Sequence, residues 1–265
     1  YFCLRVDALS ADPSSPVHLM VIDHLAHGIT ARDLPQVQFT LHAAMLDNLT
    51  RLRAPREAYS SYLIGGGSFS VPRSLLAQGA GPMTVAEIDP EVTRLAAEEF
   101  WFDPDAAEIW YEDARRALLI RPEARFDVII GDAFTDVVVP VHLITREFYE
   151  LVADRLTPEG SYLMNVIDYE DRLGALSSIV LTLSEVFPVV EVWTRATQPE
   201  PGARMIFTVV AGQTPTPLDQ FTAPAPDMMT FAALGDGFVQ ALAQERGMIL
   251  TDDYAPIDRL MGRPD

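Results

Sequence analysis

The sequence has a single cysteine and no long uninterrupted apolar run. Cys3 has no second cysteine to pair with, which excludes an internal disulfide and any zinc site built from cysteines. The most apolar stretch, residues 176–193, is interrupted by Glu185 and Pro188, so the sequence predicts no segment that crosses a bilayer. The chain begins at Tyr1 rather than Met, and we expect further residues, with room for a membrane domain, ahead of it.

Basic residues are also few. The 19 Lys and Arg residues stand against 38 Asp and Glu residues, and the formal net charge at pH 7 is -19. A chain of this charge repels phosphate backbones and lacks the counterion release that drives nucleic-acid binding, so DNA and RNA are excluded as partners. The same field attracts cations, which favours a positively charged small molecule as ligand.

The chain is long enough for one large domain with a small appendage, since it has 265 residues of which 49% are hydrophobic. Residues 1–30 contain two extended runs separated by the turn formers of residues 10–16, which predicts a β-hairpin. A helix is predicted over residues 34–52. We expect residues 1–50 to form a small N-terminal β domain with a linking helix, and residues 51–265 to form the larger domain.

From residue 60 onward strand-like and helix-like segments alternate, which is the pattern of βαβ units and a parallel sheet. The near-continuous apolar character of residues 162–167 is typical of a strand covered on both faces. The last two strands, residues 189–196 and 203–211, have no clear helix between them, which predicts an antiparallel pair at one edge. We therefore predict an α/β fold: a methyltransferase-like, doubly wound, mostly parallel sheet with a small N-terminal β-hairpin domain. A proline-rich linker over residues 213–226 and a closing helix follow the sheet.

Ligands of an open α/β sheet bind beyond the carboxyl ends of the strands, so the residues that end each strand carry the most information. Gly65, Gly66 and Gly67 follow the first of these strands and allow a tight turn close to a ligand, at the start of the next helix. Ser70 stands where the dinucleotide pattern has a further glycine, which disfavours a pyrophosphate. Glu87 ends the next strand, about 20 residues on, where an acid accepts both hydroxyls of a ribose.

Further acids follow. Asp89 is predicted to cap the helix that starts at Pro90, which leaves Glu87 for a ligand. Asp113 either accepts a hydrogen bond from an adenine amino group or caps the following helix, and the spacing leaves both roles open. Asp132 ends the next strand, where we expect the reacting end of a nucleotide-like ligand.

Four motifs in this order, IGGGSFSVPR, AEIDPEV, YEDAR and FDVIIGDAFTD, resemble the polyamine aminopropyltransferase (spermidine synthase) family over nearly the whole chain. The motifs VPVHLITREFY and TDDYAP are similar to those of spermidine synthase-like domains in bacterial proteins fused to membrane domains. The resemblance implies a catalytic domain that binds S-adenosylmethionine or its decarboxylated form and transfers a group to a polyamine or similar amine. It further implies release of methylthioadenosine without a metal. We also expect a cytoplasmic location and a homo-oligomer, a dimer.

The resemblance also implies roles for individual residues. Glu87 would hold the ribose and Asp113 the adenine, with Ile88 and Ala114 beside them, and Asp132 would bind the attacking amine. An amine with a pKa of about 10.4 is protonated at neutral pH, so a carboxylate that orients it and takes its proton suits the reaction. The remaining candidates are Gly65, Gly66, Gly67, Ser68 and His42 for the donor, and Asp136, His142, Asp253 and Tyr254 for the acceptor.

This chain departs from the family pattern at three places. Ser68 stands where the family has an aspartate that pairs with the donor's ammonium, so a charge-assisted hydrogen bond of roughly 1.5 to 3 kcal/mol becomes a neutral one. The loss of that charge admits intact S-adenosylmethionine as donor. Leu41 and Ala43 flank His42 where the family has a tyrosine and a glutamate, and Asp136 is one residue later than the family's second acid.

Four functions therefore stand open at the level of the sequence. The first is aminopropyl transfer to an amine. The second is a lyase or cyclase reaction on intact S-adenosylmethionine, which releases methylthioadenosine without an acceptor. The third is methyl transfer, and the fourth is a non-catalytic sensor that keeps the nucleotide pocket. The nucleoside product distinguishes among them.

Overall fold

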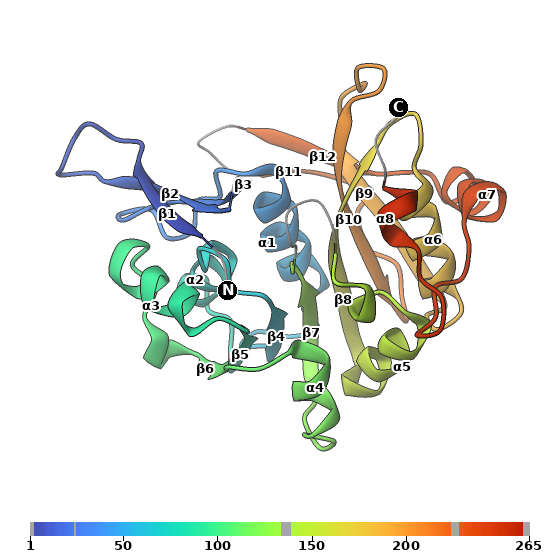
Figure 1. The fold of residues 1–265 in the computed structure, drawn as a ribbon, viewed down its shortest axis with the longest axis horizontal. Coiled ribbons are helices and arrows are strands. Elements are labelled where there is room, and N and C mark those ends of the chain that lie inside the picture. Colours follow the sequence, from blue (N-terminus) through green and yellow to red (C-terminus); the bar gives the residue numbers. More distant parts are fainter. Residues whose placement is uncertain (1–2, 24, 134–138, 224–227, 262–265) are drawn as a thin grey trace.

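The computed structural model describes residues 3–23, 25–133, 139–223 and 228–261. In these residues a large twisted sheet of nine strands forms the centre of the molecule (Figure 1). Its strands are β4 (Ser61–Ile64), β5 (Met83–Ala86), β6 (Glu108–Trp110), β7 (Phe126–Gly131), β8 (Leu156–Tyr169), β9 (Val189–Arg195), β10 (Arg204–Gly212), β11 (Gln220–Ala223) and β12 (Met229–Ala233). Their order is β11-β12-β9-β10-β8-β7-β4-β5-β6.

The strand directions confirm the predicted methyltransferase-like α/β fold. Strands β4 to β8 pair in parallel, and β10 lies antiparallel between β8 and β9. Parallel strands that are buried on both faces have continuous apolar sequences, and every residue of β4, β5 and β7 is buried. The carboxyl ends of β4, β5 and β7 consequently meet at one edge of the sheet.

Helices cover both faces of this sheet. They are α1 (Leu41–Arg53), α2 (Ser70–Ala77), α3 (Pro90–Glu99), α4 (Ala114–Leu119), α5 (Arg146–Arg155), α6 (Gly174–Ser184), α7 (Asp236–Arg246) and α8 (Ile257–Leu260), with short 3-10 turns η1 (Pro104–Ala106) and η2 (Val141–Leu143). Side chains of α1, α2 and α3 share one apolar core with the sheet, and those of α4 to α8 share another. None of the helices in the described ranges has the length and apolarity that a membrane crossing requires.

The sequence predicted that the antiparallel pair of β9 and β10 would form one edge of the sheet. In the structure this pair lies inside the sheet. β12 pairs with β9, and β11 pairs with β12, so two more strands extend the sheet. β11 falls inside residues 213–226, which were predicted to be a linker. Its Phe221 packs against Trp193 and Phe231, with ring centroids 5.5 and 5.3 Å apart. These contacts decide the pairing, and a proline-rich composition does not reveal them.

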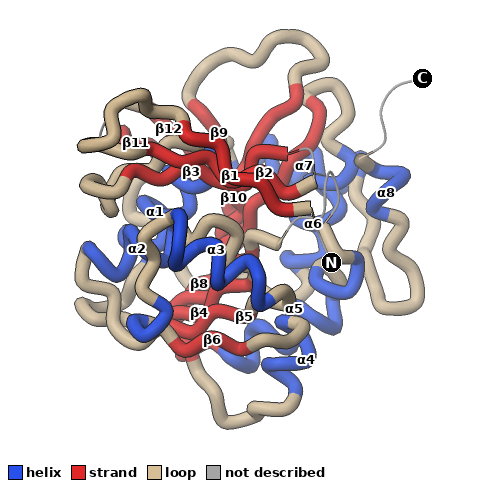
Figure 2. Tube along the Cα trace, turned by 60° about the vertical axis from the view of Figure 1, so that its left-hand side comes forward, coloured by secondary structure: helices blue, strands red, loops and turns tan. Residues whose placement is uncertain are grey.

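The N-terminal unit is a three-stranded antiparallel sheet rather than the predicted hairpin. Its strands are β1 (Leu4–Ala8), β2 (Val17–Ile22) and β3 (Leu25–Ala31). The predicted second run turns back after β2, where Asp23 has a φ of 55° and its carboxylate accepts the Cys3 amide at 2.9 Å. Figure 2 shows this small sheet beside α2 and α3. The imidazole of His18 lies 2.8 Å from the Glu99 carbonyl, and Arg73 donates to the Ala31 carbonyl at 2.8 Å.

The linking helix is shorter than predicted, because α1 starts at Leu41 after Thr40 in an extended conformation. Its buried face packs on the large sheet, where Ala44 and Leu46 share a core with Leu163. This packing places His42, in the first turn of α1, near the carboxyl ends of the central strands.

Candidate active site

Two adjoining cavities open at the carboxyl ends of β4, β5 and β7, where ligands of this fold class bind. The smaller cavity, about 210 Å³, is bordered by the ends of β4, β5 and β7 and by η2. The larger cavity, about 350 Å³, extends over α1, β8 and β10. Both cavities are lined by His27, Gly65, Gly67 and Asp132. The two cavities therefore meet at Asp132.

The glycine turn has the geometry that its sequence indicates. Gly65 and Gly67 have φ values of +89° and +52°, which side chains rarely adopt. A Cβ on Gly66 would lie 2.1 Å from the ring of Phe69, and Phe69 itself takes a left-handed φ of 55° at the start of α2. A larger residue at 66 would displace this ring, so the three glycines are needed for the turn itself as well as for an approaching ligand.

Glu87 ends β5 and lines the smaller cavity. Its Oε2 accepts the Gly66 amide and its Oε1 accepts the Asp89 amide, both at 2.9 Å. The side chain is buried, and burial raises its pKa above the ordinary value. Asp89 caps α3 through the Glu91 amide, as predicted, and the binding of a ligand by Glu87 stays a prediction. Ile88 lines the same cavity and is exposed.

Asp113 both caps a helix and faces the smaller cavity. Its Oδ1 accepts the Arg116 amide at 2.9 Å at the start of α4, and its Oδ2 lies 2.6 Å from Nε2 of His142. Ala114 lines the cavity beside it. The sequence had placed His142 on the acceptor side, whereas the structure places it in the smaller cavity, against the acid expected to meet the adenine.

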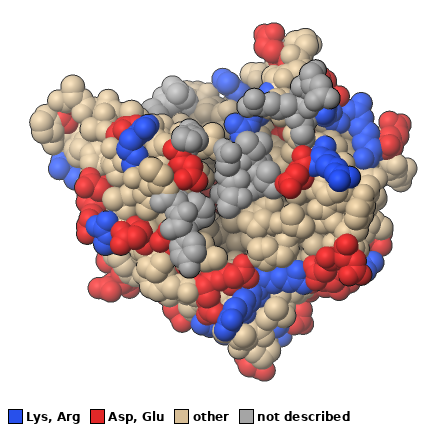
Figure 3. Space-filling view, viewed as in Figure 1, with Lys and Arg blue, Asp and Glu red and all other residues tan. Residues whose placement is uncertain are grey.

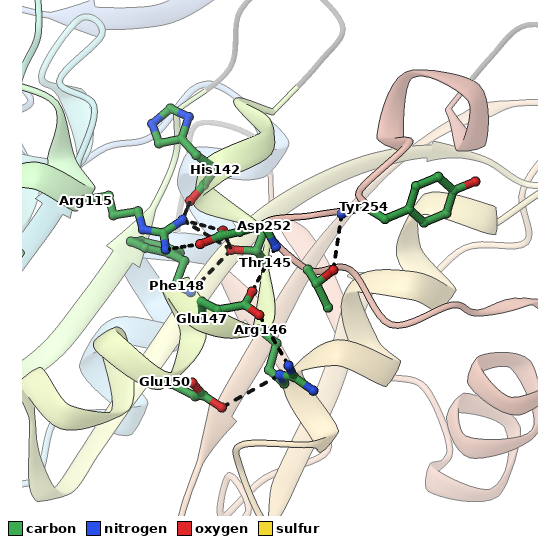
Figure 4. Close-up of polar contacts among 10 residues, drawn as sticks. Arg115, His142, Thr145, Arg146, Glu147, Phe148, Glu150, Asp252 and Tyr254 are labelled. Atoms are coloured by element: carbon green, nitrogen blue, oxygen red, sulfur yellow. Dashed lines mark hydrogen bonds and ion pairs between the residues drawn. The ribbon is translucent and has the colours of Figure 1, made fainter.

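In the closing motif TDDYAP, Asp252 pairs with Arg115 and lines neither cavity itself (Figure 4). Asp252 accepts two hydrogen bonds from Arg115, each 2.6 Å, and the guanidinium holds the pKa of this carboxyl below its ordinary value. Neither Asp253 nor Tyr254, two of the four predicted acceptor residues, lines either cavity. The Tyr254 side chain is 58% exposed, and in Figure 4 its ring points away from His142. Asp136, another predicted acceptor residue, lies outside the described residues.

Asp132 has a neighbour that the sequence did not reveal. Nδ2 of Asn165, on β8, donates to Asp132 Oδ1 at 3.0 Å. Asn165 is 3% exposed and lines the larger cavity, and its Oδ1 has no hydrogen-bond partner in the described structure. The sequence does show Asn165 as a lone amide within the apolar strand of residues 162–167. Its contact with Asp132 could not be predicted, because it depends on β8 pairing in parallel with β7.

Ser68 and His42 line the larger cavity and not the smaller one. Ser68 is 2% exposed, and its Oγ has no partner among the described residues. A Cβ on Gly28 would lie 1.9 Å from that Oγ, so the small β3 residue makes room for the turn. Arg204 and Ile206 on β10 line the same cavity and were not predicted.

The fold defines a methyltransferase-like α/β protein with a small N-terminal β unit. No protein-family model matches the chain. In sequence it is 31% identical over 144 residues to the "Probable polyamine aminopropyl transferase" of Bifidobacterium longum, a match that covers 52% of this chain and 32% of that protein. It is 26% identical over 209 residues to the "Polyamine aminopropyltransferase" of Vibrio vulnificus, covering 75% and 68%. The chain thus spans about a third of the length of the first relative and about two thirds of the second.

Solved structures agree with the fold. A probable spermidine synthase from Corynebacterium glutamicum superposes with a TM-score of 0.79 at 20% identity, covering 96% of this chain and 95% of that one. Human methyltransferase-like protein 13, solved with SAH, has a TM-score of 0.54 at 20% identity, covering 84% and 93%. Together with the sequence relatives, these matches confirm the resemblance to the polyamine aminopropyltransferase (spermidine synthase) family. The membrane-fused subgroup stays a prediction.

Proposed function

We propose that this protein is an aminopropyltransferase of the spermidine synthase type. It transfers the aminopropyl group of decarboxylated S-adenosylmethionine to an amine and releases methylthioadenosine. The observation that carries the proposal is the position of Asp132. This carboxylate lies where the two cavities meet, next to an unpartnered carbonyl oxygen of Asn165. A nucleoside in one cavity and an amine in the other would react at this point.

The smaller cavity has the groups that a nucleoside requires. Each oxygen of Glu87 accepts one backbone N–H, and a carboxylate oxygen has a second lone pair for a ribose hydroxyl. Asp113 likewise has capacity left for an adenine amino group, so its capping role and its predicted ligand role are compatible. Ile88 and Ala114 supply apolar surface on which the base can lie.

The amine is prepared for attack at the meeting point of the cavities. An ammonium group carries three donors, of which the Asp132 carboxylate and Asn165 Oδ1 accept two. When the amine passes a proton to Asp132, its nitrogen lone pair attacks the methylene that is bonded to the sulfonium. The new N–C bond forms as the C–S bond breaks, and the sulfur leaves with that electron pair as the neutral thioether of methylthioadenosine. Holding both reactants in line supplies the remaining acceleration.

The identity of the nucleoside product tests the proposal. Incubation with decarboxylated S-adenosylmethionine should give methylthioadenosine only when a primary amine is also present, as measured by liquid chromatography. Methylthioadenosine formed from S-adenosylmethionine without any acceptor would instead identify a lyase or cyclase. S-adenosylhomocysteine would identify a methyltransferase, and binding without any product would identify a sensor.

Asp132→Asn is the corresponding variant. It keeps the shape of the side chain but removes the base, so kcat should fall by about 10²- to 10⁴-fold while the affinity for methylthioadenosine changes little. Asp236→Asn, which makes the same change at an exposed residue in the first turn of α7, serves as the control and should keep full activity. Turnover at the normal rate in Asp132→Asn would show that another group takes the proton.

A further inference from the structure

The larger cavity runs from Asp132 along two adjacent strands that lie side by side in Figure 1, β8 and β10. Alternate residues of a strand face the same side of a sheet. Asn165 and Ile167 of β8 and Arg204 and Ile206 of β10 all line the cavity, and Ile206 is paired with Ile167. The cavity therefore has a polar group at the Asp132 end, an apolar middle and Arg204 beyond it.

Arg204 is the unexpected member of this set. Its side chain is exposed, and its guanidinium has no hydrogen bond or ion pair with any residue of the described structure. Asp132 is the sole carboxylate among the described lining residues of the larger cavity. A diamine bound with one ammonium at Asp132 would bring its second ammonium toward the positive charge of Arg204, which opposes binding.

The spacing of these two charges sets the kind of ligand that fits. Arg204 is paired with Tyr169, four residues along β8 from Asn165. At a rise of roughly 3.3 Å per residue, the backbone positions lie about 13 Å apart along the strand. An arginine side chain that extends toward Asp132 would leave a span of only a few methylene groups for a ligand.

We propose that the acceptor is an amino acid whose primary amine is separated from its carboxylate by a short methylene chain. Asp132 binds the amine, Ile167 and Ile206 contact the methylenes, and Arg204 binds the carboxylate. The inference rests on the proposed function, and it replaces the diamine of that reaction by an ω-amino acid. The transfer itself is unchanged: the N–C bond forms, the C–S bond breaks, the amine proton goes to Asp132, and the carboxylate takes no part.

Two acceptor series of matched length test this proposal. With decarboxylated S-adenosylmethionine as donor, kcat/KM is measured for 4-aminobutanoate, 5-aminopentanoate and 6-aminohexanoate and for the diamines with the same numbers of carbon atoms. At least one amino acid should exceed its matched diamine about tenfold or more, since a charge-assisted contact replaces a repulsion. Preference for the diamine at every length would overturn the proposal.

Variants at Arg204 give the sharper test. Arg204→Gln should raise KM for the amino acid about tenfold, Arg204→Lys should restore part of the affinity, and Arg204→Glu should reverse the preference toward the diamine. Arg125→Glu makes the same charge change at an exposed residue just before β7, at the opposite end of that strand from Asp132 and in a separate cavity, and should leave the preference unaltered. If all Arg204 variants keep the wild-type ratio, Arg204 does not contact the acceptor.

A third arm distinguishes a carboxylate of the acceptor from one of the donor. If Arg204 bound the carboxylate of intact S-adenosylmethionine, that donor would be used with a diamine, and Arg204→Gln would abolish this use. Such a result would overturn the proposal.

Calorimetric titration of the amino acids in the presence of methylthioadenosine measures binding without turnover. Binding that depends on Arg204 without any transfer would refute the proposed function alone, whereas transfer to diamines without dependence on Arg204 would refute this inference alone.

Discussion

Glu87 and Asp132 are both acids at the carboxyl ends of parallel strands, but their surroundings differ. Glu87 is buried and accepts two backbone amides, one of them from the glycine turn. Asp132 is half-buried and, among the described residues, accepts a hydrogen bond from Asn165. A buried acceptor with fixed partners suits the binding of a ribose, whereas a partly open carboxylate next to a spare carbonyl suits an amine that must gain and lose a proton.

We expect Glu87→Gln to weaken the binding of methylthioadenosine by about 10- to 100-fold, since it replaces a charge-assisted acceptor and turns an amide toward backbone donors. Burial raises the Glu87 pKa, so as the pH is lowered the wild type should begin to lose affinity at a higher pH than it would with an exposed glutamate. Titrations of methylthioadenosine at several pH values measure this loss of affinity at low pH. The variant has no carboxyl at this position and should not show it. The effect of Glu87 on folding stability depends on pH in the opposite direction from its effect on ligand affinity. Its contribution to stability is present at low pH and is lost as the pH rises through the folded pKa.

Glu91→Gln is the control for this experiment, because Glu91 is exposed on the neighbouring helix α3 and pairs with Arg94. It should bind methylthioadenosine like the wild type at every pH. If Glu87→Gln and Glu91→Gln behave alike, Glu87 does not contact the ribose.

At the scale of elements, a single ion pair joins four segments beside the smaller cavity. Arg115 belongs to α4, donates to the carbonyl of His142 in η2 at 3.1 Å, and pairs with Asp252 of the C-terminal segment. Asp252 also accepts a hydrogen bond from Thr145, which caps α5, at 2.7 Å. The position of His142, and through it that of Asp113, therefore depends on this pair.

Asp252→Asn should lower the free energy of unfolding at pH 7 by about 1 kcal/mol, a value reduced for the solvent exposure of the carboxylate. The folded pKa of Asp252 is depressed below its ordinary value of 3.8, so its contribution is present above that pH and is lost as the pH falls through the folded pKa. Denaturant titrations at pH 7 and near pH 3 measure the difference. Asp253→Asn, at the exposed neighbour, should change neither stability nor nucleoside affinity, and an equal effect of both substitutions would contradict the role of the pair.

At the scale of the whole molecule, the excess of acidic residues acts against the compact state. Acidic side chains are spread around the face shown in Figure 3 rather than gathered in one patch. With a net charge of -19, their mutual repulsion destabilises the folded chain at low ionic strength. Salt screens this repulsion, since the Debye length falls from about 30 Å at 0.01 M to about 8 Å at 0.15 M.

We therefore expect the midpoint of thermal unfolding to rise by a few degrees between about 0.01 and 0.15 M NaCl at pH 7. Differential scanning calorimetry gives the midpoint. The same series at pH 5.5, closer to the isoelectric point of about 4.5, should show a smaller rise because fewer net charges remain. A midpoint that falls with salt at pH 7 would mean that attractive ion pairs outweigh the general repulsion.

The site divides into residues that local sequence indicates and residues that it does not. Gly65 and Glu87 lie where they were predicted, because alternating strands and helices force the carboxyl ends of parallel strands to one edge. Asn165 and Arg204 were missed. Each stands at a strand position that acquires meaning only when the neighbouring strand is known, and β10 reaches its place between β8 and β9 by long-range pairing.

By itself, the sequence determined the α/β class, the glycine turn, the acids at the strand ends and the acidic charge, since these follow from local periodicity, backbone sterics and composition. Only the tertiary structure decided the third strand of the N-terminal sheet, the pairing of β11, the ion pair of Asp252 with Arg115 and the position of Arg204 in the larger cavity. The physical reason is that each of these depends on packing or charge pairing between segments that are far apart in the chain, and no local pattern encodes the partner.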